Sequence, residues 1–98
     1  MALELNEANF EENTQEGLVL VDFYATWCSP CRALAPILEN VTDVKVVKVN
    51  TDLNMTLASG FNISALPTLV FLKDGVEVDR TMGLQSLEAL QTKVDGLK

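Results

Sequence analysis

Two cysteines, the only ones among the 98 residues, stand two residues apart in the segment Trp27-Cys28-Ser29-Pro30-Cys31-Arg32. The segment follows the apolar run Leu18–Tyr24, which is typical of a strand buried on both faces. A C-x-x-C pair at the junction of such a strand with a following helix indicates a dithiol that is reversibly oxidised. Residues three apart on a helix share a face, so the two sulfur atoms can meet. The sequence therefore predicts thiol–disulfide exchange at Cys28 and Cys31.

The two cysteines are expected to have different roles. If a helix begins at Cys28 or Ser29, the unpaired backbone N–H groups at its start stabilise a thiolate on Cys28. Cys31 lies one turn further along, where we expect it to be more buried and to keep its proton. Cys28 is therefore the predicted nucleophile, and Cys31 is predicted to resolve the mixed disulfide that the attack produces.

Two other interpretations of the cysteine pair are weaker. Zinc and iron–sulfur sites normally take four ligands, mostly cysteine and histidine, but the chain has no histidine and no third cysteine. A permanent disulfide across so small a loop contributes only about 2 kcal/mol in the chain-entropy model. That is weak motivation for a structural bridge in a reducing compartment. We therefore expect no metal and no cofactor apart from the Cys28–Cys31 disulfide itself.

Asp22 is a lone carboxylate within the apolar run, six residues before Cys28. Burial in a sheet would raise the pKa of this carboxyl, and the protonated acid could then exchange a proton with Cys31. The spacing is equally compatible with an Asp22 that reaches solvent at the end of its strand. Lys48, on the next predicted strand, is a candidate partner for Asp22, although taken alone it is typical of a snorkelling surface lysine.

The elements that would position these residues alternate between strands and helices. Strands are predicted over 2–5, 18–24, 44–50, 68–73 and 76–82, and helices over 7–14, from 28 or 29 to 40, over 53–59 and over 87–95. Asp74-Gly75 joins the last two strands as a two-residue hairpin turn. This order is typical of an α/β fold with a partly parallel sheet. Without a repeat or a linker, residues 1–98 are expected to form a single domain.

Composition and charge exclude several classes of function. Seven Lys and Arg against 14 Asp and Glu give a net charge of −7, which disfavours nucleic acid and anionic membranes as partners. No run approaches the ~20 apolar residues of a membrane helix. The residues after Met1 lack the basic and apolar regions of a secretory signal, so a cytoplasmic protein is expected.

The segment Leu66-Pro67-Thr68 precedes a predicted strand. Only about 5–6% of X–Pro bonds in folded proteins are cis, so the residues on their own predict a trans bond at Pro67. Taken alone, Trp27, Met82 and Leu84 are compatible with ordinary core residues.

Taken together, these motifs resemble the thioredoxin family. The matching segments are Val19–Phe23, Trp27–Arg32, Ala35–Leu38, Val47–Asp52, Leu66–Leu69 and Lys73–Gly75, followed by Gly83. They cover nearly the whole chain in the family's order, which is far more specific than an isolated C-x-x-C. The resemblance implies the thioredoxin fold, with a central five-stranded mixed β-sheet flanked by four α-helices.

The resemblance also implies roles for individual residues. It makes Asp22 a proton donor and acceptor buried under Cys31, with Lys48 tuning it. It makes Pro67 cis and facing the dithiol, with the backbone of Leu66 pairing with a substrate strand. The implied docking surface around the nucleophile consists of Trp27, Ser29, Pro30, Ala65, Leu66, Pro67, Met82, Gly83 and Leu84.

The activity implied by the resemblance is the reduction of protein disulfides by a monomer that a thioredoxin reductase recharges. A disulfide oxidase or isomerase is an alternative that needs an oxidising compartment, and a subunit that only docks a partner would use the apolar rim without redox turnover. Two departures from the family's pattern stand out. Ser29 replaces the usual glycine between the cysteines, and the segment from Pro36 to Lys48 is shorter than usual.

Overall fold

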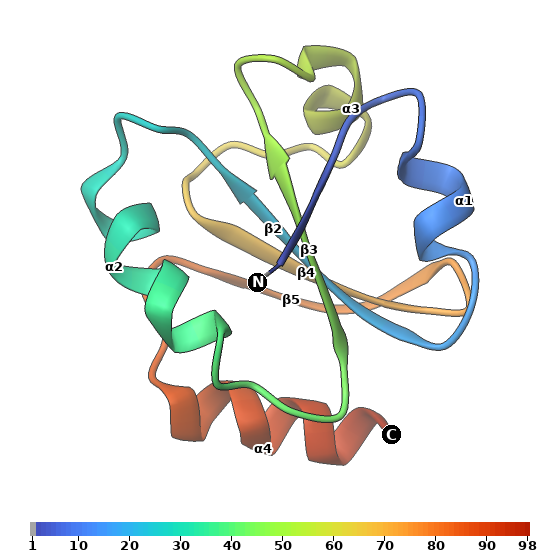
Figure 1. The fold of residues 1–98 in the computed structure, drawn as a ribbon, viewed down its shortest axis with the longest axis vertical. Coiled ribbons are helices and arrows are strands. Elements are labelled where there is room, and N and C mark those ends of the chain that lie inside the picture. Colours follow the sequence, from blue (N-terminus) through green and yellow to red (C-terminus); the bar gives the residue numbers. More distant parts are fainter. Residues whose placement is uncertain (1) are drawn as a thin grey trace.

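The computed structural model describes residues 2–98, which form a five-stranded sheet with four helices packed on its two faces (Figure 1). The strands are β1 (Leu3–Leu5), β2 (Leu18–Tyr24), β3 (Lys45–Asn50), β4 (Thr68–Lys73) and β5 (Val76–Met82). The helices are α1 (Phe10–Thr14), α2 (Ser29–Leu38), α3 (Met55–Gly60) and α4 (Leu87–Leu97). The expected mixed sheet flanked by four helices is confirmed.

Strand β2 occupies the centre of the sheet. The strand order is β1-β3-β2-β4-β5, with β1, β3 and β2 parallel to one another and β4 antiparallel to both β2 and β5. Five consecutive residues of β2, Val19–Phe23, are buried, as the apolar run predicts. Because β2 is central, the segment that follows Tyr24 leaves the sheet in the middle of its carboxyl edge, and this is where α2 begins.

Each face of the sheet has its own hydrophobic core. Side chains of Val19, Val21 and Phe23 alternate with those of Leu20 and Asp22, because successive residues of a strand point to opposite faces. The first set packs with α1 and α3 in a cluster that includes Phe10, Val47, Val49, Val70, Leu57 and Phe61. The second face packs with α2 and α4 in a cluster that includes Leu20, Leu34, Leu38, Leu69, Phe71, Leu90 and Val94. Asp22 therefore points toward the α2 and α4 side.

All four helices differ from their predicted bounds at one end or both, and α3 runs from Met55 to Gly60 instead of over 53–59. Helix α1 begins at Phe10 rather than at residue 7, because Asn6 Oδ1 accepts hydrogen bonds from the N–H groups of Ala8 (2.9 Å) and Asn9 (3.0 Å). Such local bonds compete with helical ones and hold residues 7–9 in a turn. Helix α2 ends at Leu38, two residues before the predicted end, and α4 continues to Leu97.

The packing of α4 on the sheet generates a stability prediction. Leu90 is fully buried, whereas Leu87 on the same helix is 38% exposed. We expect Leu90→Ala to lower the free energy of unfolding by about 2–5 kcal/mol, because the substitution leaves a cavity in the core. Leu87→Ala is the matched control, with an expected loss below about 1 kcal/mol. Urea titration of both variants measures this difference, and equal losses would contradict the packing described for α4.

Candidate active site

The two cysteines lie where β2 passes into α2. Cys28 is the N-cap of α2, with φ −89° and ψ 111°, and Pro30 lies in the first turn, where its missing N–H is harmless. The backbone N–H of Cys28 donates to the carbonyl of Ala25 at 3.2 Å. Its own carbonyl accepts from the N–H of Arg32, also at 3.2 Å. Backbone hydrogen bonds on both sides therefore fix the position of Cys28.

Cys28 and Cys31 form a disulfide, with their Cα atoms 5.2 Å apart. The sulfur of Cys28 also accepts a hydrogen bond from the backbone N–H of Cys31 at 3.3 Å. One of the N–H groups that the start of a helix leaves unpaired thus points at this sulfur. The sulfur of Cys28 therefore lies at the start of α2, next to a backbone N–H that has no partner within the helix, as expected from the sequence.

The two cysteines are almost equally buried in the disulfide form, so the expected excess burial of Cys31 is very small. Cys28 is 5% exposed and Cys31 is 4% exposed, so both are nearly covered. They form a small cluster with Ala25, against which Leu66 and Tyr24 pack. In the disulfide each sulfur also covers part of the other. The position of Cys31 one turn further into the helix therefore makes little difference to its burial.

Asp22 is completely buried, and this decides between the two alternatives that its spacing left open. Neither of its carboxylate oxygens has a hydrogen-bond partner among the groups of residues 2–98. Burial raises the pKa of Asp22 from 3.8 to about 7, since the attraction of Lys48, which lowers it, does not compensate for the lost hydration, and Glu4 raises it further. Near neutral pH this carboxyl is therefore able both to hold and to release a proton.

Lys48 lies directly across from Asp22 in the register of β3 with β2. Its Nζ is 4.4 Å from the centre of the Tyr24 ring, a cation–π geometry, and it is partly buried. The Tyr24 hydroxyl donates to Glu4 Oε1 at 2.7 Å, and burial together with Glu4 raises the pKa of Tyr24 above its usual range. Lys48 is therefore held at a defined place beside the buried acid.

A pocket of about 220 Å³ connects this lysine with the dithiol. Cys31 and Lys48 both line it, and the other lining residues are Tyr24, Ala25, Thr26, Arg32 and Ala35. Asp22 does not line the pocket, but its register partner Lys48 does, so the pocket borders the lysine beside the buried carboxyl as well as Cys31. The structure thus brings Asp22, Lys48 and Cys31 into one region.

The peptide bond between Leu66 and Pro67 is cis. The trans bond predicted from the residues alone is wrong, and the cis bond implied by the family resemblance is confirmed. Two hydrogen bonds flank this dipeptide: the Pro67 carbonyl accepts from the N–H of Gly83, in another segment, at 2.8 Å, and within the same segment Thr68 Oγ1 donates to the Ala65 carbonyl at 2.6 Å. The surroundings of Pro67 include Gly83, which follows β5 in the chain. The sequence of the Leu66-Pro67 dipeptide alone does not reveal such distant contacts.

Large apolar side chains form an exposed rim near the buried disulfide. Trp27 is 67% exposed, Met82 60% and Leu84 52%. None of them is therefore a core residue, although their residue types alone are compatible with core positions. Trp27 Nε1 donates to Asp52 Oδ2 at 2.8 Å, which fixes the indole on the surface. Gly83 has φ +84°, a conformation that strains any residue with a Cβ. Ser29, Pro30 and Ala65 are exposed as well.

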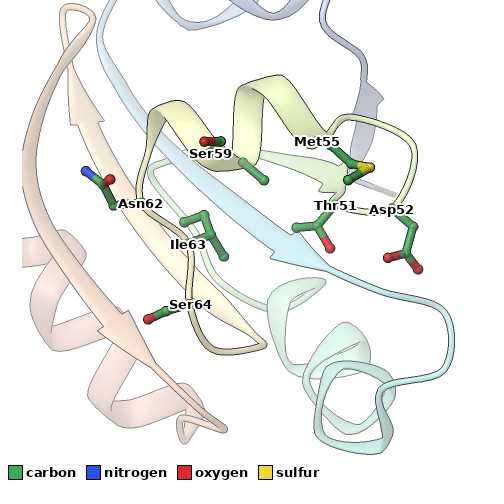
Figure 2. Close-up of a pocket in the computed structure, with 8 residues that line it drawn as sticks. Thr51, Asp52, Met55, Ser59, Asn62, Ile63 and Ser64 are labelled. Atoms are coloured by element: carbon green, nitrogen blue, oxygen red, sulfur yellow. The ribbon is translucent and has the colours of Figure 1, made fainter.

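A surface groove that the sequence did not reveal continues from this rim. Trp27, Ala65 and Leu66 line a pocket of about 340 Å³ together with Thr51, Ala58, Ile63 and Ser64. The last four residues also line a neighbouring pocket of about 550 Å³, with Asp52, Met55, Ser59 and Asn62 (Figure 2). Figure 2 shows these side chains along the β3–α3 connection, α3 and the segment after it. The only sequence signal was that Thr51 and Asp52 end one of the matched segments.

Residues 2–98 contain no group of three or more His, Cys, Asp or Glu side chains arranged to hold a metal ion. Among the helices of the same residues, none has both the length and the apolar character that crossing a membrane requires.

Comparisons with known proteins agree with this geometry. A family model described as Thioredoxin matches residues 1–96. The chain is 40% identical to thioredoxin from Listeria monocytogenes over 100 residues, which cover 97% of each chain, and 39% identical to thioredoxin from Bacillus subtilis over 94 residues, which cover 91% of this chain and 90% of that one. A solved structure of a mutant thioredoxin from Halobacterium salinarum NRC-1 superposes with a TM-score of 0.90 at 35% identity, covering 97% of this chain and 88% of the other. The chain therefore belongs to the thioredoxin family, and with its Cys28–Cys31 disulfide it is a thiol–disulfide oxidoreductase that acts on disulfide substrates.

Proposed function

We propose that the protein reduces disulfides in other proteins, with Cys28 as the nucleophile and Cys31 as the resolving cysteine. The observation that carries this proposal is the hydrogen bond from the Cys31 N–H to the sulfur of Cys28 at the N-cap of α2. A thiolate on Cys28 would gain this bond and the favourable end of the helix dipole, whereas Cys31 lies inside the helix. The nucleophile is thereby distinguished from its partner even though both are buried.

The reaction proceeds in two exchanges. The Cys28 thiolate attacks one sulfur of the substrate disulfide, the substrate S–S bond breaks, and one substrate sulfur leaves as a thiolate while the other is held in a mixed disulfide. Cys31 then loses its proton and attacks the Cys28 sulfur, which releases the second substrate thiolate. Overall, two electrons pass from the dithiol to the substrate, and the protein is left with a Cys28–Cys31 disulfide. The two released substrate thiolates take up two protons.

Asp22 is the proposed acceptor of the Cys31 proton in the second exchange and its donor in the reverse direction. Its support is the pKa of about 7, which makes both steps feasible near neutral pH, and the pocket that Cys31 shares with Lys48. Lys48 is proposed to tune the acid, because its charge opposes the effect of burial on Asp22. Neither residue contacts the substrate in this scheme.

The exposed rim is the proposed docking surface for the substrate polypeptide. Trp27, Met82 and Leu84 offer apolar area next to a disulfide that is otherwise covered. The backbone of Leu66 would pair with an extended substrate segment, as a strand adds to a partner. Gly83 would allow the two backbones to approach closely, and Ser29, Pro30 and Ala65 add exposed area to the surface. Pro67 is itself buried, so its proposed part is to hold the segment next to Leu66 rather than to offer surface. The groove lined by Asp52 and Met55 extends it toward α3.

We infer the remaining partners from the chemistry. A dithiol that has given up its electrons must be reduced again, so we propose a thioredoxin reductase as the donor and the cytoplasm as a compartment reducing enough for this direction of exchange. Both reacting sulfurs belong to one chain, which supports action as a monomer and a single domain over residues 1–98. Two sulfurs complete the electron transfer, so no bound cofactor is required, and the charge of −7 argues against nucleic acid as a partner.

Reduction of insulin in the presence of dithiothreitol tests the proposed activity. We expect the wild type to accelerate precipitation of the insulin chains and Cys28→Ser to fall to the rate of dithiothreitol alone, because no nucleophile remains. The rise in turbidity measures the rate. A wild type that is no faster than Cys28→Ser would refute the proposed reductase.

Trapping tests the order of the two cysteines. Cys31→Ser keeps the attacking sulfur but cannot resolve the intermediate, so we expect it to accumulate a stable mixed disulfide with a reducible protein substrate. Non-reducing electrophoresis and mass spectrometry would place the link at Cys28, and Cys28→Ser is the control that should trap little. Preferential trapping by Cys28→Ser would reverse the assignment.

The burial of Asp22 predicts a dependence of stability on pH. The folded protein holds the Asp22 proton up to about pH 7, whereas the unfolded chain loses it near pH 3.8. The folded state thus binds more protons between these values, and its stability falls as the pH rises from about 4 to about 7. We expect Asp22→Asn, compared with the wild type, to gain on the order of 4 kcal/mol across this window.

Urea titration of the oxidised proteins at several pH values measures this gain, since the disulfide prevents the cysteines from titrating. Asp95→Asn, at an exposed position of α4, is the matched control and should show no comparable trend. The same Asp22→Asn variant should reduce insulin more slowly at neutral pH. A difference in stability that does not change with pH would mean that Asp22 is ionised throughout.

A further inference from the structure

The side chain of Arg32 folds back over the loop that carries Cys28. Its Nη1 donates to the carbonyl of Thr26 at 2.9 Å, and its Nη2 donates to the hydroxyl oxygen of Ser29 at 3.0 Å. One guanidinium therefore joins the residue two positions before Cys28 to the residue directly after it. The planar guanidinium of arginine presents several N–H donors in a fixed geometry and therefore suits such a bridge, whereas the compact ammonium group of lysine does not reach two acceptors in the same geometry.

The backbone of Arg32 takes part in the same arrangement. Its N–H donates to the carbonyl of Cys28 at 3.2 Å, so main chain and side chain of Arg32 together enclose the Cys28 segment. We call the contacts among Thr26, Ser29 and Arg32 the loop clasp. The clasp lies at the surface, because all three residues are exposed. Its effect is therefore expected to be modest and sensitive to salt.

We propose that Ser29 and Arg32 are positioning residues that set the balance between the dithiol and the disulfide, because Ser29 holds the Arg32 cation next to the Cys28 segment. This inference rests on the proposed function of Cys28. A contact that is equally strong in two states shifts no equilibrium between them. The clasp is present with the disulfide closed, but the disulfide is neutral, and only the thiolate of the reduced protein gains from a fixed positive charge nearby. The clasp therefore favours the reduced form.

Ser29 is the residue that distinguishes this loop from the usual pattern with glycine. A glycine has no oxygen to accept from Arg32 Nη2, so the guanidinium would keep only its bond to the Thr26 carbonyl. A serine that merely stiffened the loop would be replaced equally well by alanine, which also has a Cβ. The hydroxyl–guanidinium bond predicts instead that alanine and glycine at this position behave alike, and that the effect of either depends on Arg32.

The test is a double-mutant cycle with Ser29→Ala, Arg32→Gln and the double variant. For each protein, the equilibrium constant for exchange with dithiothreitol is determined from the fraction of disulfide at fixed ratios of the reagent. We expect each single substitution to shift this constant toward the disulfide by about 2- to 5-fold, and the double variant to shift it no further than Arg32→Gln alone. The pH midpoint for alkylation of Cys28 should rise in parallel, and ~1 M salt should shrink all of these shifts.

Lys45→Gln is the matched control, because it removes one exposed positive charge whose Nζ bonds to the Asn13 carbonyl, away from the loop. It should leave both readouts at the wild-type values, and Arg32→Lys should fall between the wild type and Arg32→Gln. Additive effects of Ser29→Ala and Arg32→Gln, an unchanged Ser29→Ala, or an equal shift in Lys45→Gln would overturn the inference. Any of these results with an active wild type would leave the reductase proposal standing, whereas an inactive wild type in the insulin assay would refute that proposal itself.

Discussion

The burial of β2 between two neighbouring strands and two helical layers is the constraint on which the site depends. Its position at the centre of the sheet covers Val19–Phe23 on both faces, and it delivers the chain to the middle of the carboxyl edge. The same burial desolvates Asp22, which accounts for its perturbed acidity, and it sets the starting point of α2, which places Cys28 at a helix N-terminus. The burial of Asp22 and the place of Cys28 at a helix N-terminus therefore have the same structural cause.

Covered reactive groups and an uncovered apolar rim stand side by side in this molecule. The disulfide and Asp22 are buried, whereas Trp27 and Met82 expose large side chains to solvent. The buried carboxyl without a partner costs stability, and the exposed tryptophan forgoes the stabilisation that burial of its ring would give. Exposed apolar side chains beside a reactive pair suit the proposed docking of other polypeptides, and the hydrogen bond from Trp27 to Asp52 limits the freedom of the exposed indole.

The order of the elements and the chemistry of the cysteines could be predicted because both follow from local patterns. Apolar runs identified the strands, and the C-x-x-C spacing identified the dithiol. The sequence-based predictions were wrong or incomplete where the local structure depends on side-chain hydrogen bonds or on contacts between distant segments. The Asn6 side chain delays the start of α1, the isomer at Pro67 depends on surroundings that include Gly83, and the groove brings Thr51 and Ile63 together from different segments. The burial of Asp22 was undecided until the strand order was known.

The two outer strands of the sheet differ from its interior in a way that bears on self-association. Strand β1 has only three residues, and β5 carries Glu77, Asp79 and Arg80 and is offset from β4 by an irregularity at Phe71 and Leu72. Short, charged or bulged outer strands are poor templates for the main chain of another molecule, so neither margin of the sheet invites fibre-like growth.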